Sequence, residues 1–271
     1  MGVSGRRGAM AVKKLLAIDV GNTHSVVGYF EGETFIQQWR ISSGLNRTED
    51  EFGVIINYLI ALYGISAKDI SGVAISSVVP DLTFGMVHMA KKYFNCEPFL
   101  ITPDIDLGMK IKYVDPGAVG ADRLCNSVAA IEKYGKPLVI VDFGTATTFD
   151  CIDDNGDYLG GLIAPGIQTS ISALHLRAAR LPLVELEFPA QLIGRTTDES
   201  IQSGILNGAI CMLEGVIRRL KTELGENLKV VATGGLADKM AGKSDAIDIV
   251  DRHLCLEGIV KLYYKNYGNS I

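Results

Sequence analysis

The sequence is poor in the features that mark several large classes of protein. Aromatic residues make up only 7% of its 271 residues, and no basic run after residue 14 is longer than two. A nucleic-acid-binding surface normally shows clustered lysine and arginine, whereas the formal net charge here is −5, so the sequence predicts no nucleic-acid partner. No window approaches about 18 uninterrupted apolar residues, which predicts that no segment spans a membrane.

Patterns of metal-binding and disulfide-forming residues are also missing. The five cysteines, at positions 96, 125, 151, 211 and 255, form no Cys-x-x-Cys pair, and the four histidines are scattered. A structural zinc site needs clustered ligands. The sequence therefore favours isolated cysteines that act as small buried apolar side chains in a reducing environment, and it predicts a cytoplasmic protein.

Two common nucleotide-binding motifs are absent. A P-loop requires G-x-x-x-x-G-K-[ST], and the segment GLADKMAGKS at 235–244 ends correctly but places Ala237 where the first glycine is needed. No G-x-G-x-x-G motif follows a predicted strand. If the chain binds a nucleotide, it uses another kind of loop.

Apolar residues and glycines, by contrast, are plentiful. With 48% hydrophobic residues and 30 glycines, the chain can build one large domain or two of about 130 residues. Apolar periodicity and turn signals predict strands at 15–20, 25–30, 34–41, 72–79, 98–101, 137–143, 147–152 and 229–235. They predict helices at 48–63, 81–94, 166–180, 199–224 and 259–268.

These elements indicate an internal repeat. Each half opens with a β-hairpin and continues with alternating helices and strands, which predicts a duplicated α/β fold. The predicted boundary lies near residues 133–136, giving an N-terminal domain at 15–134 and a C-terminal domain at 135–271. Residues 1–14 lack the apolar core of a signal peptide, and we predict a disordered leader there.

Two hairpins carry nearly the same turn. Residues 17–30 read AIDVGNTHSVVGYF and residues 140–151 read IVDFGTATTFDC. Glycine and small polar residues leave backbone N–H groups open to an anion, and an aspartate at the strand end suits a hard cation. One such hairpin would be an ordinary turn, but its repetition in both halves favours two loops that grip a polyphosphate and its metal.

Further motifs give these loops a family resemblance. DPGAVGADR at 115–123, ISSVVP at 75–80, GGLIAPGI at 160–167 and ATGGL at 232–236, together with the two turns, closely resemble the type III pantothenate kinases. These enzymes use ATP to phosphorylate pantothenate in the first step of coenzyme A biosynthesis. The resemblance implies the duplicated ribonuclease-H-like fold of actin and the sugar kinases, with two domains that each hold a mixed five-stranded sheet and helices.

The resemblance also implies roles for particular residues. Contacts with ATP are implied for Asp19, Val20, Gly21, Asn22, Thr23, His24, Ser25, Val26 and Thr145, with Asp19 also holding Mg²⁺. Contacts with pantothenate are implied for Tyr113, Gly120, Ala121, Asp122, Arg123 and Thr197. In this scheme Asp122 is the general base, Arg123 binds the substrate carboxylate, and Asp142 holds a monovalent cation, K⁺ or NH₄⁺. The family is homodimeric, with the substrate site completed by the partner subunit.

The residues alone leave several roles open. Asp142 would suit Mg²⁺ as well as a monovalent cation. Asp150 is either structural or a second acid, and a lone histidine such as His24 is more often structural. Without the neighbouring motifs, Asp122 would be interpreted as a helix N-cap or as part of a local ion pair, and a surface ion pair is the alternative role of Arg123.

Two other functions compete with the kinase. Some relatives act as non-catalytic accessory factors in transcription, and the intact Asp19, Asp122 and Asp142 argue against that alternative. A general sugar or acid kinase of the same fold is the other alternative. The set of residues at 115–123 argues against it, because that broader group lacks the set.

Overall fold

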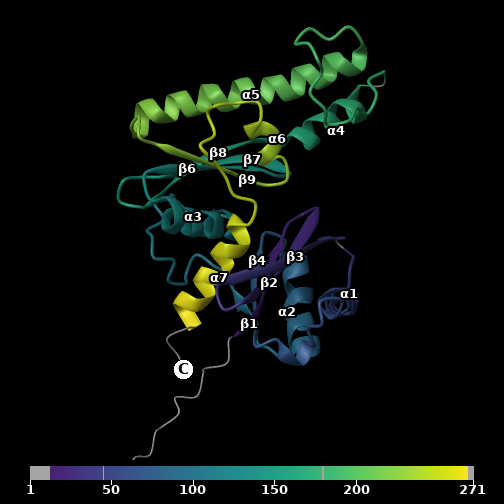
Figure 1. The fold of residues 1–271 in the computed structure, drawn as a ribbon, viewed down its shortest axis with the longest axis vertical. Helices are drawn as coiled ribbons and strands as arrows, with labels where there is room; N and C mark the ends of the chain where they lie inside the picture. The colour runs from purple at the N-terminus through teal and green to yellow at the C-terminus, as the bar shows by residue number, and fades with distance from the viewer. Residues whose placement is uncertain (1–12, 45, 179, 268–271) are drawn as a thin grey trace, which may run out of the picture. The chain divides into compact units, whose positions relative to one another are not determined.

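The structure, a computed structural model, describes residues 13–44, 46–178 and 180–267. By its internal contacts the chain divides into two compact units, the first ending at Ile101 and the second beginning at Thr102 (Figure 1). Residues 1–12 of the predicted leader lie outside the described residues. Lys14, at the end of that predicted leader, already belongs to the first strand.

The first unit is built on one five-stranded sheet with the strand order β3-β2-β1-β4-β5. Its strands are β1 (Lys14–Val20), β2 (His24–Glu31), β3 (Thr34–Ser42), β4 (Gly72–Ser77) and β5 (Phe99–Leu100). Its helices are α1 (Glu49–Ala61), the 3₁₀ helix η1 (Ala67–Asp69) and α2 (Pro80–Phe94). Strands β1 to β3 form an antiparallel meander, while β4 runs parallel to β1, and β5 parallel to β4.

Local sequence signals explain where α1 begins and how it packs. Thr48 caps the helix: its hydroxyl accepts from the backbone N–H of Glu51, and the Glu51 carboxylate accepts from the backbone N–H of Thr48. Phe52, Ile56 and Ile60 recur every four residues and are fully buried in the core of this unit. The apolar stripe of α1 therefore faces the sheet.

The second unit repeats this plan, with the strand order β10-β9-β6-β7-β8. Its strands are β6 (Leu138–Phe143), β7 (Ala146–Ile152), β8 (Tyr158–Pro165), β9 (Lys229–Thr233) and β10 (Ile249–Val250). Its helices are η2 (Pro116–Ala118), α3 (Ala121–Tyr134), α4 (Ile167–Arg177), α5 (Thr197–Leu224), α6 (Ala237–Ala241) and α7 (Leu254–Tyr267).

The two sheets have the same topology. Reading the second order backwards, β8, β7, β6, β9 and β10 take the places of β3, β2, β1, β4 and β5. The strand directions also agree, since β6–β7–β8 is antiparallel, β9 runs parallel to β6, and β10 runs parallel to β9. The predicted duplicated α/β fold with two mixed five-stranded sheets is confirmed.

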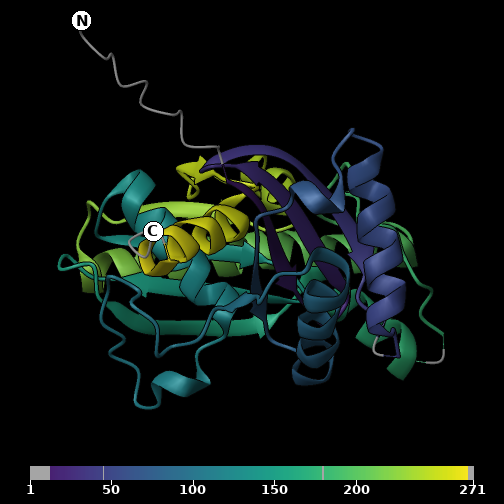
Figure 2. The same ribbon diagram turned by 90° about the horizontal axis from the view of Figure 1, so that it is seen from below.

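In the second unit the helices cover both faces of the sheet (Figure 1). Helix α5 packs on one face, where Val139, Val141 and Phe149 form a core with Leu206 and Leu213. Helix α3 packs on the other face against β6 and β7, and α7 lies beside α3 (Figure 2). Because side chains alternate along a strand, the neighbours of those core residues point toward α3.

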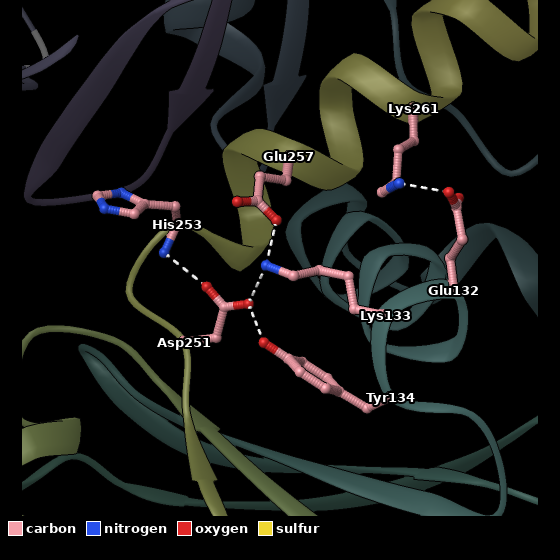
Figure 3. A network of polar contacts seen from close by, with 7 residues as sticks. All are labelled: Glu132, Lys133, Tyr134, Asp251, His253, Glu257 and Lys261. Atoms are coloured by element: carbon pink, nitrogen blue, oxygen red, sulfur yellow. Dashed lines mark hydrogen bonds and ion pairs between the residues drawn. The ribbon is translucent and has the colours of Figure 1, made fainter. Parts of the chain in front are cut away.

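The C-terminal end of α3 is anchored by polar contacts (Figure 3). Lys133 donates to the carboxylates of Asp251 and Glu257, and the Tyr134 hydroxyl donates to Asp251 at 2.7 Å. Lys261 on α7 pairs with Glu132. These contacts join α3 to α7 and to the segment that precedes α7.

The packing of α3 bears on the predicted domain boundary. The sequence analysis assigned no helix or strand to residues 102–136 and placed the boundary near residues 133–136. In the structure, α3 packs against α7 and β6, so the contact-based division falls between Ile101 and Thr102 instead. Helix α3, whose first residues are candidate substrate contacts, thus belongs with the second sheet.

Helix α5 is the one helix in the described part of the chain that is long and apolar enough to cross a membrane, which taken alone is weak evidence. Its buried residues, including Leu206, Leu213 and Ile217, pack on the second sheet. We therefore describe α5 as a core helix. The absence of a membrane span stays a prediction.

Candidate active site

The first candidate phosphate loop is the turn from β1 to β2. Asp19 lies near the end of β1, where it is paired with Val26 on β2 and with Ser76 on β4. Val20 is buried as the last residue of β1, and the Gly21 N–H donates to the His24 carbonyl at 3.1 Å. Asn22 and Thr23 form the exposed tip of the turn.

A serine pair supports this turn from below. The Ser43 hydroxyl donates to the Gly21 carbonyl at 2.5 Å, and the Ser43 N–H donates to the Thr23 carbonyl at 3.0 Å. Ser25, buried like Ser43, places its hydroxyl oxygen 3.0 Å from that of Ser43. Position 43 is not among the predicted site residues, because a serine directly after a strand carries no signal by itself.

His24, the first residue of β2, has a local partner. Its Nδ1 lies 2.8 Å from Nη2 of Arg40, and burial together with the Arg40 charge lowers the pKa of His24. The imidazole is therefore neutral near pH 7 and accepts from the guanidinium. This contact holds the His24 side chain beside the loop.

The second candidate phosphate loop is the turn from β6 to β7. The Gly144 N–H donates to the Ala146 carbonyl at 3.0 Å, as the Gly21 N–H does in the first turn. The Thr145 carbonyl accepts from the Gly166 N–H at 3.2 Å and from the Thr169 hydroxyl at 2.6 Å, which ties the turn to the start of α4. A Cβ at Gly166 would collide with the Thr145 carbonyl, so this close approach needs glycine.

The GADR segment forms the N-terminus of α3. Gly120 is the cap residue, Ala121 is the buried first residue of the helix, and the Asp122 carboxylate accepts from the Arg123 N–H at 2.8 Å. Burial raises the pKa of Asp122, although hydrogen bonds and the charge of Arg123 oppose the effect. A carboxylate with a raised pKa is a better proton acceptor, which suits the general-base role.

Arg123 points back toward the sheet. Its Nε donates to Asp150 at 2.7 Å, and the Tyr158 hydroxyl donates to the same oxygen of Asp150, also at 2.7 Å. Asp150 is completely buried and Arg123 is 9% exposed. Burial raises the pKa of Asp150 to about 6, against the opposing influence of Arg123 and Tyr158.

Asp142 lies close to this group on the same face of the sheet. Asn126 on α3 donates from Nδ2 to Asp142 at 3.2 Å, while the Asn126 Oδ1 is buried without a hydrogen-bond partner in the described residues. Burial, followed by the charges of Asp122 and Asp150, raises the pKa of Asp142 to about 7. Negative charge thus accumulates here without full compensation.

Two predicted segments converge on these residues. A Cβ on Gly234, in the ATGGL segment at 232–236, would collide with the Asp142 carboxylate, so this segment lies against that carboxylate. A Cβ on Gly160 would lie 3.0 Å from the Tyr113 ring, and one on Gly161 would lie 3.3 Å from Nη2 of Arg123. Tyr113 and Arg123 therefore lie on either side of the glycine pair in β8.

Thr197 is separate from this cluster within one chain. It is the exposed first residue of α5, next to the cap residue Thr196. Helix α5 lies on the face of the sheet opposite to α3 (Figure 1). The structure thus brings together Asp122, Arg123 and Asp142 in the second unit, with Tyr113 against Gly160 of β8, but not Thr197.

No group of three or more histidine, cysteine, aspartate or glutamate side chains in the described part of the chain is arranged to hold a metal ion. A surface cavity of about 350 Å³ lies at the other end of α5, lined by Lys221, Asn227 and Asp248 among others. None of its lining residues belongs to the cluster around Asp122.

The sequence analysis missed two members of the cluster and left a third undecided. Asn126 and Tyr158 were not singled out, and Asp150 was held equally open to a structural or a functional role. The spacing of Asn126 from Asp122, one helical turn later, would have placed both on one face of α3. Nothing in the local sequence marks Tyr158, because its contact with Asp150 depends on the turn between β7 and β8.

Comparisons with known proteins identify the family of this chain. The family model for type III pantothenate kinase matches residues 15–219. A type III pantothenate kinase from Halalkalibacterium halodurans is 45% identical over 252 residues, covering 93% of this chain and 99% of the relative.

Solved structures agree with the fold. A protein from Campylobacter jejuni, described as a Baf family transcriptional activator, has a TM-score of 0.60 at 19% identity over 93% of this chain and 99% of its own. A Listeria monocytogenes protein described as an N-acetylmannosamine kinase has a TM-score of 0.50 at 12% identity, covering 93% and 99%. At these identities the similarity concerns the fold alone, whereas the family model and the 45% identical relative show that this chain belongs to the type III pantothenate kinase family.

Proposed function

We propose that this chain uses ATP to phosphorylate the primary hydroxyl of pantothenate, the first step of coenzyme A biosynthesis, with Asp122 as the general base. The observation that carries the proposal is the pairing, at the N-terminus of α3, of a carboxylate of raised pKa with an arginine that has a buried, unpartnered nitrogen. The first suits a hydroxyl proton and the second suits a carboxylate.

The transfer is a nucleophilic displacement at the γ-phosphorus of ATP. The hydroxyl oxygen of pantothenate attacks the γ-phosphorus of ATP, its proton passes to the Asp122 carboxylate, and the bond to the ADP oxygen breaks. Such a transition state asks mainly for positioning and for neutralisation of charge. Asp122 supplies the base, and we assign the substrate carboxylate to Arg123, with Tyr113, Gly120 and Ala121 beside them.

We assign the ATP phosphates to the backbone N–H groups of the two exposed turns, residues 19–26 in the first unit and Thr145 in the second. Each turn presents glycine and small polar residues, and each is held by hydrogen bonds from outside the turn. In this assignment Asp19 holds Mg²⁺ together with ATP.

Asp142 is our candidate for the monovalent cation, K⁺ or NH₄⁺. The residues fit a cation, because the unpartnered Asn126 oxygen and the carboxylate of Asp142 adjoin further negative charge from Asp122 and Asp150. When bound, such a cation would neutralise charge beside the transferred phosphoryl group.

We also propose a homodimer in which the partner subunit's α5 supplies Thr197 to the pantothenate site. Thr197 does not reach the cluster of its own chain, and β8 is an edge strand. Large apolar side chains are exposed on this edge strand and elsewhere in the second unit, including Ile163 at 67%, Leu176 at 80% and Ile193 at 80%. A monomer by light scattering at assay concentration would contradict this arrangement.

For the location we propose the cytoplasm, in keeping with five free cysteines.

The deciding experiment measures ADP release from ATP, with and without pantothenate, first in sodium and then in potassium. Pantothenate-dependent ADP formation that requires potassium supports both the kinase and the cation site. A folded protein that forms no ADP with pantothenate in any salt would overturn the proposed activity.

A further inference from the structure

Arg123 forms a buried ion pair with Asp150. The phosphoryl transfer described above does not require this pair. Asp150 has no exposed surface, yet it faces an arginine rather than an apolar neighbour. Burying an ion pair costs desolvation energy, and such pairs are often replaceable by apolar residues without loss of stability. Stability alone therefore does not account for the pair.

The hydrogen bonds of Arg123 are divided unevenly over its guanidinium group. Nε is bound to Asp150 at 2.7 Å, whereas Nη2 is buried and has no hydrogen-bond partner in the described residues. A guanidinium group recognises a carboxylate through two parallel N–H bonds, so the orientation of its plane matters. The contact at Nε fixes that plane and leaves the nitrogens at the far end for another acceptor.

Tyr158 in turn fixes Asp150. Its hydroxyl donates to the same carboxylate oxygen that Arg123 uses, and its ring lies 5.8 Å from Cζ of Arg123. Tyr158 is itself held in place, because its backbone bonds with residues 110 and 112 and its side chain is fully buried. The series from Tyr158 through Asp150 to Arg123 thus connects a rigid strand to a side chain of the site.

The far end of Arg123 lies close to the backbone of β8. A Cβ at Gly161 would lie 3.3 Å from Nη2 and would collide with the carbonyl of Phe149. Only glycine fits between β7 and the guanidinium group at this position. The unpartnered nitrogen therefore borders backbone, with no side chain of β8 to occupy it.

We propose that Asp150 and Tyr158 are positioning residues for recognition of the substrate's carboxylate: they hold Arg123 by its Nε so that its remaining nitrogens stay aligned for that group. This inference rests on the proposed role of Arg123. The positioning role predicts that substitutions of Tyr158 and Asp150 raise the KM for pantothenate and leave the KM for ATP unchanged.

A double-mutant cycle tests the coupling. Tyr158→Phe removes one hydroxyl from the interior and is expected to raise the KM for pantothenate about tenfold, with kcat altered less than about twofold. In an Arg123→Lys background, which lacks the planar fork, the same change is expected to have no further effect on KM. Asp150→Ala should raise the KM further, and Asp150→Asn should recover part of the loss, because a carboxamide oxygen still accepts from Nε.

Tyr134→Phe is the matched control. Tyr134 also donates to a carboxylate at 2.7 Å, from the other end of α3. The control should lower the melting temperature as Tyr158→Phe does, but leave the KM for pantothenate unchanged. If Asp150→Ala does not fold, the cycle with Tyr158→Phe decides alone.

The outcomes separate the inference from the function on which it rests. If Arg123→Lys leaves the KM for pantothenate unchanged, the proposed carboxylate contact is wrong. If Arg123→Lys raises the KM but Tyr158→Phe does not, or if the two effects simply add, the positioning role is wrong while the proposed function stands.

Discussion

At both ends of α3, an aspartate receives hydrogen bonds from a tyrosine hydroxyl and from a cationic side chain. At the N-terminal end, Asp150 binds Tyr158 and Arg123. At the C-terminal end, Asp251 binds Tyr134 and Lys133 (Figure 3). The tyrosine contact measures 2.7 Å in both, so the two ends begin with the same chemistry.

The two ends differ in whether the cationic side chain keeps hydrogen-bond donors for another ligand. Lys133 is taken up by two carboxylates, those of Asp251 and Glu257, and its side chain is 28% exposed to solvent. Arg123 is nearly buried and keeps one nitrogen without a partner in the described residues. A lysine is a compact point charge, whereas the arginine fork can bind an aspartate through Nε and still present other donors. The same contact can therefore anchor a helix at one end and prepare a binding group at the other.

The largest expected contrast between the two ends concerns a carboxylate of α3 itself. Asp122→Asn removes the proton acceptor and should lower turnover about 10²–10⁴-fold while leaving ATP binding in place. Glu132→Gln, at the other end of the helix, breaks a surface pair with Lys261 and should leave turnover unchanged. Steady-state kinetics and ATP titration check both, and an Asp122→Asn enzyme with wild-type turnover would exclude the base role.

Removing charge at the N-terminal end tests the cation site. Asp142→Asn should abolish the activation by potassium and lower turnover at saturating potassium by about tenfold or more, because the cation loses its anionic ligand. Asn126→Ala should raise the potassium concentration needed for half-maximal activity, since it removes only a neutral oxygen. Potassium titrations of both variants give the measurement. An Asp142→Asn enzyme with an unchanged potassium dependence would place the cation elsewhere.

The sequence predicted the candidate site residues better than it predicted the residues that hold them in position. Asp122, Arg123 and Asp142 lie in motifs that stand out in the sequence, and in the structure they lie close to one another. Asp150 was undecided and Tyr158 was missed, since their contacts depend on how β7, β8 and α3 pack, which no local pattern encodes. The duplication was predictable because hairpin turns and apolar alternation repeat along the chain.

Helix α3 shows where such reasoning fails. The sequence predicts no helix within residues 102–136, whereas the structure has α3 there. The helix joins the second unit through its contacts with α7, a helix that is distant from α3 in the sequence. Periodicity within one segment indicates which face is buried, but not which distant segment will bury it.

Breaking the C-terminal anchor should affect stability rather than catalysis. Lys133→Met removes a cation from two carboxylates, one of them only 6% exposed, and should destabilise the second unit by about 2 kcal/mol. The KM for pantothenate should not change. Thermal unfolding followed with kinetics checks both parts. A raised KM at undiminished stability would mean that the two ends of α3 are not separate in function.

A final contrast distinguishes the two aspartates by the sign of a pH dependence. For Asp251, burial opposes ionisation, but hydrogen bonds from Lys133 and Tyr134 outweigh it and hold the pKa below its usual value. The wild type should therefore lose stability relative to Asp251→Asn as the pH falls below about 4. For Asp150, burial raises the pKa to about 6. The wild type should then lose stability relative to Asp150→Asn as the pH rises from about 4 to about 6, because the unfolded chain ionises first.

Each slope is at most about 1.4 kcal/mol per pH unit for a single group. Denaturant unfolding of the wild type and both variants between about pH 3 and pH 7 measures the two slopes. Slopes of the same sign would mean that both aspartates serve as stabilising anchors. Opposite slopes would mean that the pair of Arg123 and Asp150 is kept ionised near neutral pH at a cost in stability. Such a cost is expected if the pair serves to bind a substrate carboxylate.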